Sequence, residues 1–269
     1  MALVSVDSLA HRSQLLVDCR FDLADPDGGR LAFEQGHIPG AVFAVLADDL
    51  SGPPGRAGRH PLPSPATFEA AAERLGIGAA TRVVAYDRGG GGAARLWWLL
   101  RHFGHEHAAV LDGGLDAWVA TWGAVETGPA QPRTPPADRF VARPRDGDAV
   151  TADDILSGGL ALVDARVGER YRGDVEPLDP VAGHIPGARN LPFSAVAPGG
   201  RFRPAWELRD LLGAAGVDGS REAVVYCGSG VTATTLVLAA EAAGVARVRL
   251  YPGSWSEWSR RGLPSERDG

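Results

Sequence analysis

The sequence predicts an α/β protein built from two tandem copies of one domain, each with a parallel sheet flanked by helices. Three observations predict it: a pentapeptide that occurs twice, further landmarks that recur in the same order, and strand patterns that alternate with helical patterns. The length of 269 residues and the hydrophobic content of 45% suit two globular domains of medium size.

The duplication is clearest at the pentapeptide His-Ile-Pro-Gly-Ala, which occurs at residues 37–41 and again at 184–188. A short apolar run that ends in an acid precedes each copy, at Asp18 and at Asp164. Two later segments recur 140 residues further along the chain. These pairs are 82–87 with 222–227, and 113–118 with 253–258. Because all landmarks keep their order, both halves have one common design.

The predicted domains are residues 1–125 and 148–269, and residues 126–147 join them. The joining segment is rich in Pro and Arg and has no hydrophobic periodicity, so it is predicted to be a semi-rigid, extended linker. Its apolar pair, Phe140 and Val141, is expected to hold it against one of the domains.

Strand and helix patterns alternate in both halves. Short β-branched apolar runs are typical of strands that are buried on both faces of a sheet. These runs lie at 15–19, 82–87, 108–111, 161–164, 223–226 and 247–251. Helical patterns that end at glycine lie at 68–76, 92–104 and 232–244. This alternation predicts parallel sheets with helices on both faces.

Composition excludes several classes of protein. Two cysteines cannot build a disulfide framework, and no apolar run approaches the roughly 20 residues that a membrane span needs. The N-terminal segment has no apolar signal core, so a cytoplasmic protein is expected. The net charge of −6 gives no electrostatic reason to expect a nucleic-acid partner, and no membrane partner is expected either.

The candidate nucleophile is Cys227. It opens the loop Cys-Gly-Ser-Gly-Val-Thr, residues 227–232, between a predicted strand and a predicted helix. The glycines at 228 and 230 let the backbone curl so that N–H groups converge on the sulfur, and the following helix adds the positive end of its dipole. Both effects favour the thiolate, which is the reactive form. Cys19 lies inside a predicted strand without such a loop and is expected to be a structural thiol.

With these residues the chain resembles the tandem-domain rhodaneses, the family of thiosulfate and 3-mercaptopyruvate sulfurtransferases. The resemblance rests on the paired pentapeptides, the loop at 227–232 and the closing Gly-Ser-Trp-Ser-Glu-Trp at 253–258, and it runs over nearly the whole chain. It implies two rhodanese-like domains, of which only the second is catalytic. In the first half, Asp87 and a run of glycines stand where the second half has Cys227.

The resemblance implies that the protein moves a sulfane sulfur in two steps. The Cys227 thiolate takes sulfur from thiosulfate or 3-mercaptopyruvate as a persulfide, then passes it to a thiophilic acceptor such as cyanide, a thiol or reduced thioredoxin. Backbone N–H groups of the loop are expected to bind the thiolate and the persulfide. They belong to Gly228, Ser229, Gly230, Val231 and Thr232. No metal and no other cofactor are expected.

The sequence leaves the preferred donor open. Neutral residues follow the cysteine, which is similar to the 3-mercaptopyruvate branch, whereas relatives that prefer thiosulfate tend to carry Arg and Lys there; this chain has no lysine. In the 3-mercaptopyruvate branch two arginines clamp the donor. The first maps onto Arg170, and Leu178 occupies the place of the second. Either one clamp is missing, or another arginine such as Arg172 supplies it.

The same branch is proposed to use Ser229 with a histidine and an aspartate of the first half as a proton relay. His60 maps onto the histidine and Asp48 onto the acid, with Asp49 as the alternative. His60 could instead be an ordinary solvated histidine of a loop. The alternative for Arg170 is an ordinary ion pair on the surface.

Several further residues are expected to be structural. His37 and His184 recur in both halves, including the half without a catalytic cysteine. Five tryptophans are expected in the core and in inter-domain packing, although Trp255 is also a candidate for lining the pocket. They are Trp97, Trp98, Trp118, Trp255 and Trp258.

Two rival functions compete with sulfur transfer. A Cys-dependent phosphatase needs an arginine six positions after its cysteine, and this chain has Ala233 there. A persulfide carrier without turnover would use the same loop as the enzyme. Steady turnover with a small acceptor separates the enzyme from the carrier.

Overall fold

The computed structural model describes residues 2–9, 14–131, 133 and 135–268, and these group into two compact units. The first unit consists of Met1–Gly52, Pro63–Arg145 and Gly199–Phe202, and the second of Pro53–Leu62, Asp146–Pro198 and Arg203–Gly269. Neither unit is one continuous stretch of chain. Residues 53–62, from the first half of the sequence, group with the second unit, and most of the segment predicted to be a linker groups with the first.

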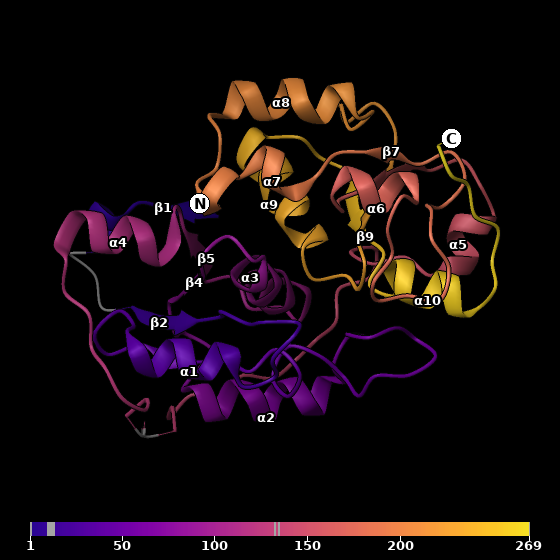
Figure 1. Cartoon of the computed structure of the whole chain (residues 1–269). Helices are drawn as coiled ribbons and strands as arrows, with labels where there is room; N and C mark the ends of the chain where they lie inside the picture. The colour runs from indigo at the N-terminus through magenta and orange to yellow at the C-terminus, as the bar shows by residue number, and fades with distance from the viewer. Residues whose placement is uncertain (1, 10–13, 132, 134, 269) are drawn as a thin grey trace. The chain divides into compact units, whose positions relative to one another are not determined.

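The described part of the first unit contains a sheet of five parallel strands in the order β1-β5-β4-β2-β3 (Figure 1). The strands are β1 (Leu3–Val4), β2 (Leu15–Asp18), β3 (Val42–Phe43), β4 (Val83–Tyr86) and β5 (Ala108–Leu111). All residues of β4 and β5 are buried, as expected for strands that are covered on both faces.

Helices cover this sheet. They are η1 (Val6–Leu9), α1 (Gly28–Gln35), α2 (Pro65–Leu75), α3 (Gly92–His102) and α4 (Gly114–Trp122). In Figure 1, α1 and α2 lie below β2, whereas α4 lies near β1. Helix α2 has a complete pair of end signals, because the Ser64 hydroxyl accepts from the Thr67 N–H and Gly76 ends the helix in the left-handed conformation.

The described part of the second unit repeats this design with four parallel strands in the order β7-β6-β8-β9. The strands are β6 (Ala161–Asp164), β7 (Arg189–Asn190), β8 (Ala223–Tyr226) and β9 (Val248–Leu250). The helices are α5 (Ala152–Leu156), α6 (Gly168–Arg172), α7 (Phe193–Val196), α8 (Ala205–Ala214), α9 (Ala233–Ala243) and α10 (Ser254–Arg260). The short helix η2 (Pro198–Gly200) spans the point at which the chain passes from the second unit to the first.

The two central strands pair in the same register in both sheets. Asp18 stands opposite Tyr86 in the first unit, and Asp164 stands opposite Tyr226 in the second. The predicted α/β fold, with a parallel sheet flanked by helices in each half, is therefore confirmed.

The repeated pentapeptide is a structural anchor. The backbone N–H of Ile38 donates to the Tyr86 hydroxyl at 3.1 Å, and that of Ile185 donates to the Tyr226 hydroxyl at 3.0 Å. The buried His37 ring stacks on Phe33, as the His184 ring stacks on Tyr171. The expectation that both histidines are structural is confirmed, because each lies within the turn that the tyrosine fastens to the central strand.

The segment predicted to be a linker packs on the first unit along part of its length. Phe140 is buried and meets the ring of Phe68 edge to face. Val141 next to it is exposed, so only one of the two expected anchors is used. The N–H of Arg143 also donates to the Phe103 carbonyl at 2.9 Å, which holds this segment against the end of α3.

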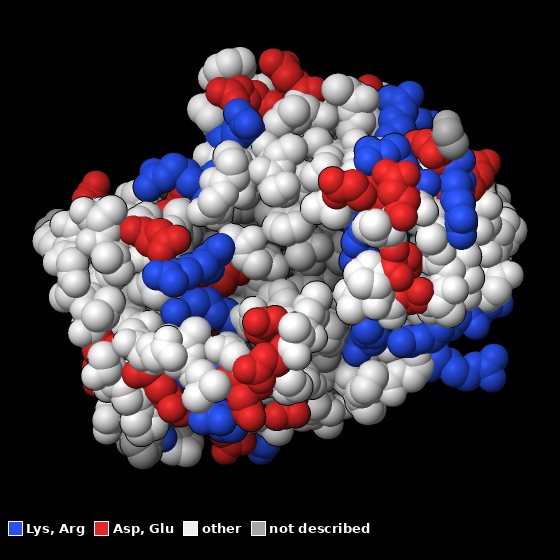
Figure 2. Space-filling model, viewed as in Figure 1, with Lys and Arg blue, Asp and Glu red and all other residues white. Residues whose placement is uncertain are grey.

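The tryptophans behave as expected for an interior. Trp97, Trp98, Trp255 and Trp258 are buried, and Trp118 is half-buried against the core of its unit. On the face shown in Figure 2, arginine and acidic side chains are interspersed. Among the described residues no helix is both long enough and apolar enough to cross a bilayer.

Candidate active site

The loop of Cys227 lies at the carboxyl end of the fully buried strand β8 and leads into α9. The thiol is 2% exposed. The Gly230 N–H donates to Cys227 Sγ at 3.1 Å, and the Cys227 N–H donates to the Ser254 hydroxyl at the same distance. The loop is further held by the Ser256 N–H, which donates to the Gly228 carbonyl at 2.9 Å.

Gly230 is required by this geometry. Its φ of +75° lies in the left-handed region, and a Cβ at this position would lie 2.4 Å from the Pro252 carbonyl oxygen. A side chain is therefore excluded by both backbone strain and a clash. The left-handed turn is what aims the Gly230 N–H at the sulfur.

The other predicted loop residues surround this turn. The Ser229 side chain points to His60, Val231 is buried, and Thr232 is the residue from which α9 begins. The Val231 carbonyl accepts a hydrogen bond from the Thr234 hydroxyl at 2.6 Å, so the entry into the helix is braced.

Residues 53–62 bring His60 to the loop. His60 Nδ1 lies 2.8 Å from Ser229 Oγ, although the two residues are 169 positions apart in the sequence. The segment is held in place by the Arg59 N–H, which donates to the Ser256 hydroxyl at 3.0 Å. A buried Gly58 lies against Gly253, where a Cβ would meet the carbonyl oxygen at 2.9 Å.

The two acids predicted for the relay belong to the first unit. Asp48 is exposed there. Asp49 is buried, accepts a hydrogen bond from the Val45 N–H and forms an ion pair with Arg74. Burial raises the pKa of Asp49 above its ordinary value, although the hydrogen bond and the charge of Arg74 oppose that rise. The relay role of Asp48 therefore stays a prediction, as does the alternative of Asp49.

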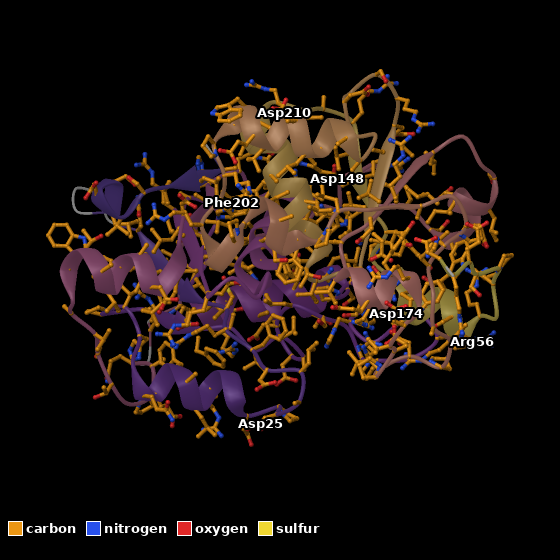
Figure 3. The ribbon with its side chains drawn as sticks, turned by 45° about the horizontal axis from the view of Figure 1, so that its top comes forward. Asp25, Arg56, Asp148, Asp174, Phe202 and Asp210 are labelled. Atoms are coloured by element: carbon orange, nitrogen blue, oxygen red, sulfur yellow. The ribbon has the colours of Figure 1, made fainter. Side chains whose placement is uncertain are left out.

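Arg170 lies on α6 and is tied to two buried carboxylates. Its Nη2 donates to Glu176 Oε1 at 2.6 Å and lies 3.5 Å from Asp179 Oδ2. Leu178 is exposed, 41% of its surface remaining accessible. Arg172 pairs instead with Asp174, which follows α6 and is labelled in Figure 3.

A second arginine near the loop was missed in the sequence. Arg59 forms an ion pair with the buried Asp179, so one carboxylate holds both Arg59 and Arg170. Its neighbour His60 was found through a family resemblance, but no local pattern singles out Arg59. Periodicity and composition describe neighbours along the chain, and this contact joins residues 120 positions apart.

The first unit has a carboxylate where the second has its thiol. Asp87 follows β4, accepts from the Gly89 N–H at 2.7 Å and accepts from the Ala93 N–H at 3.1 Å. Burial raises the pKa of Asp87, and these two donors oppose the rise. In the first unit, the Asp87 carboxylate thus accepts the N–H groups of the loop that corresponds to the Cys227 loop.

Cys19 lies in a setting that suppresses reactivity. It is 1% exposed, and its thiol donates to the Val17 carbonyl over 3.6 Å. Burial raises the pKa of Cys19 well above its ordinary value, and the Asp18 carboxylate raises it further. A thiol that stays protonated is a poor nucleophile, which supports the structural role expected for Cys19.

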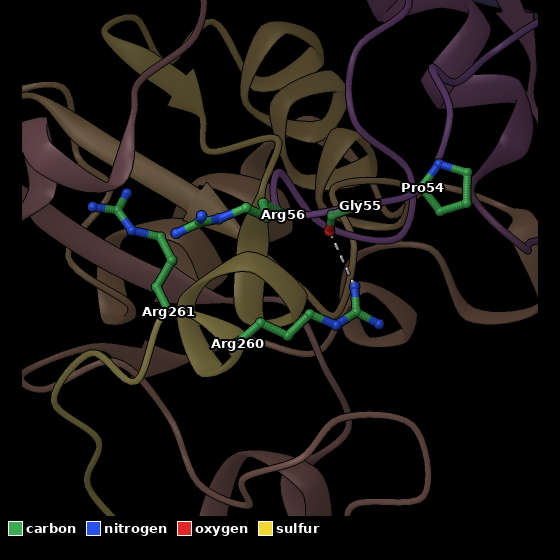
Figure 4. Close-up of a pocket in the computed structure, with 5 residues that line it drawn as sticks. All are labelled: Pro54, Gly55, Arg56, Arg260 and Arg261. Atoms are coloured by element: carbon green, nitrogen blue, oxygen red, sulfur yellow. Dashed lines mark hydrogen bonds between the residues drawn. The ribbon is translucent and has the colours of Figure 1, made fainter.

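A cavity of about 410 Å³ lies in the second unit away from the loop residues (Figure 4). Its lining consists of Pro54, Gly55, Arg56, Arg260 and Arg261. Arg260 donates to the Gly55 carbonyl at 3.5 Å, whereas Arg261 pairs with Asp153 and Glu257. Cys227 is not part of this lining, so the cavity is not the site of the thiol.

Known proteins match the chain along nearly its whole length. The rhodanese-like domain family matches residues 5–121 and 148–261. SseB of Mycobacterium tuberculosis, provisionally named a thiosulfate sulfurtransferase, is 46% identical over 252 residues, 91% of this chain and 87% of SseB. Human 3-mercaptopyruvate sulfurtransferase is 39% identical over 249 residues, 88% of this chain and 82% of the human protein.

The comparison with solved structures agrees with this family match. The crystal structure of SseA from Escherichia coli, described among 3-mercaptopyruvate sulfotransferases, matches with a TM-score of 0.81 and 33% sequence identity, over 95% of this chain and 99% of SseA. Fold and site thus define a duplicated α/β protein with one cysteine loop at the end of a central strand. The chain belongs to the rhodanese family, with two rhodanese-like domains in tandem, and it is a sulfurtransferase.

Proposed function

We propose that Cys227 carries the transferred sulfur as a persulfide, and that the donor is 3-mercaptopyruvate or thiosulfate. The observation that supports it most is the Gly230 N–H aimed at Cys227 Sγ over 3.1 Å, at the carboxyl end of β8. A backbone donor in this position stabilises an anionic sulfur without any proton transfer. Relatives of this chain are named for both donors.

In the first step the thiolate attacks the outer sulfur of the donor. The new bond joins Cys227 Sγ to that sulfur, and the bond from the sulfur to the rest of the donor breaks. Its electron pair leaves with sulfite when the donor is thiosulfate. When the donor is 3-mercaptopyruvate, the pair leaves with the enolate of pyruvate, which takes up one proton.

In the second step an acceptor attacks the outer sulfur of the persulfide. The bond from that sulfur to Cys227 Sγ breaks, and Cys227 becomes a thiolate again. Cyanide leaves as thiocyanate, and a thiol acceptor leaves as a persulfide. Cyanide, a small thiol or reduced thioredoxin has the soft nucleophile that this step requires. Dividing the transfer in this way lets one donor-binding site serve chemically different acceptors.

The test is to load the protein with each donor in the absence of an acceptor and to locate the sulfur by peptide mass spectrometry. One added sulfur atom is expected on the peptide that contains Cys227, and cyanide should remove it with formation of thiocyanate. The Cys19 peptide is the internal control and should stay unmodified. Sulfur found on Cys19 alone, or on neither peptide, contradicts the proposal.

His60 and Ser229 are proposed to deliver the proton that the pyruvate enolate needs. The 2.8 Å contact between His60 Nδ1 and Ser229 Oγ provides a path for that proton beside the cysteine. Sulfite leaves without a proton. His60→Gln is therefore expected to lower kcat/KM for 3-mercaptopyruvate about a hundredfold and for thiosulfate much less.

Steady-state rates with both donors at several pH values measure this difference. His107→Gln changes an exposed histidine of the first unit and serves as the matched control. Equal losses with the two donors would show that His60 supports the loop and transfers no proton.

A further inference from the structure

Two guanidinium groups lie against the backbone of Gly228, immediately after the catalytic cysteine. A Cβ at Gly228 would lie 2.9 Å from Arg59 Nη2 and 3.3 Å from Arg170 Nη1. Arg59 comes from the segment 53–62 and Arg170 from α6, and both belong to the second unit. The two cations therefore converge on the residue that follows Cys227.

One edge of each guanidinium is fixed by carboxylates. Asp179 is fully buried and pairs with Arg59 through Oδ1 and with Arg170 through Oδ2. Glu176, also buried, accepts from Arg170 over 2.6 Å. Because both long side chains are already ordered, little conformational entropy is lost when an anion meets them.

The edge that faces Gly228 is unused. Among the described residues, none accepts a hydrogen bond from Arg59 Nη2 or Arg170 Nη1. The Nε atoms of both arginines are buried and also have no acceptor there. Guanidinium N–H groups that have no acceptor within the described residues are suited to a ligand that brings oxygen acceptors.

We propose that Arg59, together with Arg170, binds the oxyanion head of the sulfur donor beside Cys227, which makes Arg59 a substrate-binding residue; this rests on the proposed function of the loop. The ligand class is a small anion with a transferable sulfur close to a carboxylate or sulfonate-like group. Planar guanidinium groups bind such heads through paired N–H donors. With Leu178 exposed and apolar, Arg59 supplies the second cation from another segment of the chain.

The test compares Arg59→Gln with Arg56→Gln in the full-length protein. Arg56, labelled in Figure 3, is exposed on the same segment but lines the separate cavity. Arg59→Gln is expected to raise KM for the donor roughly tenfold to a hundredfold, the effect of losing a charged hydrogen bond. Discharge of the preformed persulfide by cyanide should keep its rate, and Arg56→Gln should leave both quantities unchanged.

The two donors form separate arms of the experiment. A larger rise in KM for 3-mercaptopyruvate assigns the clamp to a carboxylate, and a larger rise for thiosulfate assigns it to the sulfonate-like oxygens. An unchanged KM for both donors overturns the proposal, as does an equal rise in Arg56→Gln.

A second variant covers the case in which Arg59→Gln does not fold. Gly228→Ala leaves Asp179 and Glu176 unchanged and needs no left-handed backbone, but its methyl group would lie 2.9 Å from Arg59 Nη2 and 3.3 Å from Arg170 Nη1 and so displaces the two guanidinium groups. Donor KM should rise in this variant too, and an unchanged value overturns the clamp. If wild-type protein forms no Cys227 persulfide, the proposed function itself fails; a normal persulfide with unchanged donor KM in the variants rejects only the role of Arg59.

Discussion

Replacing Cys227 with alanine is expected to lower the steady-state rate of sulfur transfer at least about a thousandfold, as the loss of a nucleophile does in other covalent enzymes. The loop has no second thiol, and the other cysteine of the chain, Cys19, was expected inside a strand but directly follows the end of β2 in the first unit. Thiocyanate formation from thiosulfate and cyanide, followed by its coloured iron complex, measures the rate.

Cys19→Ala is the matched control for this experiment. It removes a thiol that is equally buried, directly after the end of β2. Turnover should stay within a factor of about two to three of wild type, with the change confined to stability. Retained activity in Cys227→Ala, or its loss in Cys19→Ala alone, would refute the assignment of the nucleophile.

Arg166→Met is expected to produce the largest loss of stability, about 3–5 kcal/mol in the free energy of unfolding of the second unit. The Arg166 side chain is 2% exposed and bonds through Nε and Nη2 to Asp164, which has no exposed surface. It also donates to Glu176 and to the Gly183 carbonyl, and lies over the ring of Trp255. Without it, the buried Asp164 loses its counter-charge, and the buried Glu176 keeps only its ion pair with Arg170.

Hydrogen exchange of peptides from β6 and β8 measures the free energy of unfolding of the second unit, because the slowest amides of a sheet open only on global unfolding. Arg172→Met is the control: its partner Asp174 is about half exposed, so the loss should stay below about 1 kcal/mol. Arg20→Met repeats the experiment in the first unit, where Arg20 bonds to the buried Asp18 in the same way. A loss below about 1 kcal/mol in Arg166→Met would contradict this account.

Much of the fold follows from local pattern. The runs at 15–18, 83–86, 161–164 and 223–226 are strands, and the helical patterns that end at Gly76 and Gly244 are helices with left-handed glycine ends. A strand buried on both faces must be apolar throughout, and a helix end needs a residue that tolerates positive φ. Both requirements are written in consecutive residues, which is why they can be predicted without the tertiary structure.

Local pattern could not predict the short edge strands, nor which segments of the chain make up each of the two units. β1, β3 and β7 contain only two residues each, too few for any periodicity to appear. The pairs of Asp18 with Arg20 and of Asp164 with Arg166 look in the sequence like ordinary polar residues two positions apart. Only burial makes them ion pairs on which the stability of each sheet depends.

By itself, the sequence determined that the chain is a duplicated α/β protein and that Cys227, the candidate nucleophile, opens a glycine loop at the end of a strand. It did so because duplication, strand burial and loop curvature leave marks in neighbouring residues. The tertiary structure alone decided that residues 53–62 join the second unit and bring His60 to Ser229 and Arg59 to Asp179. These contacts span more than a hundred positions, so they depend on how the chain packs and have no signature in local pattern.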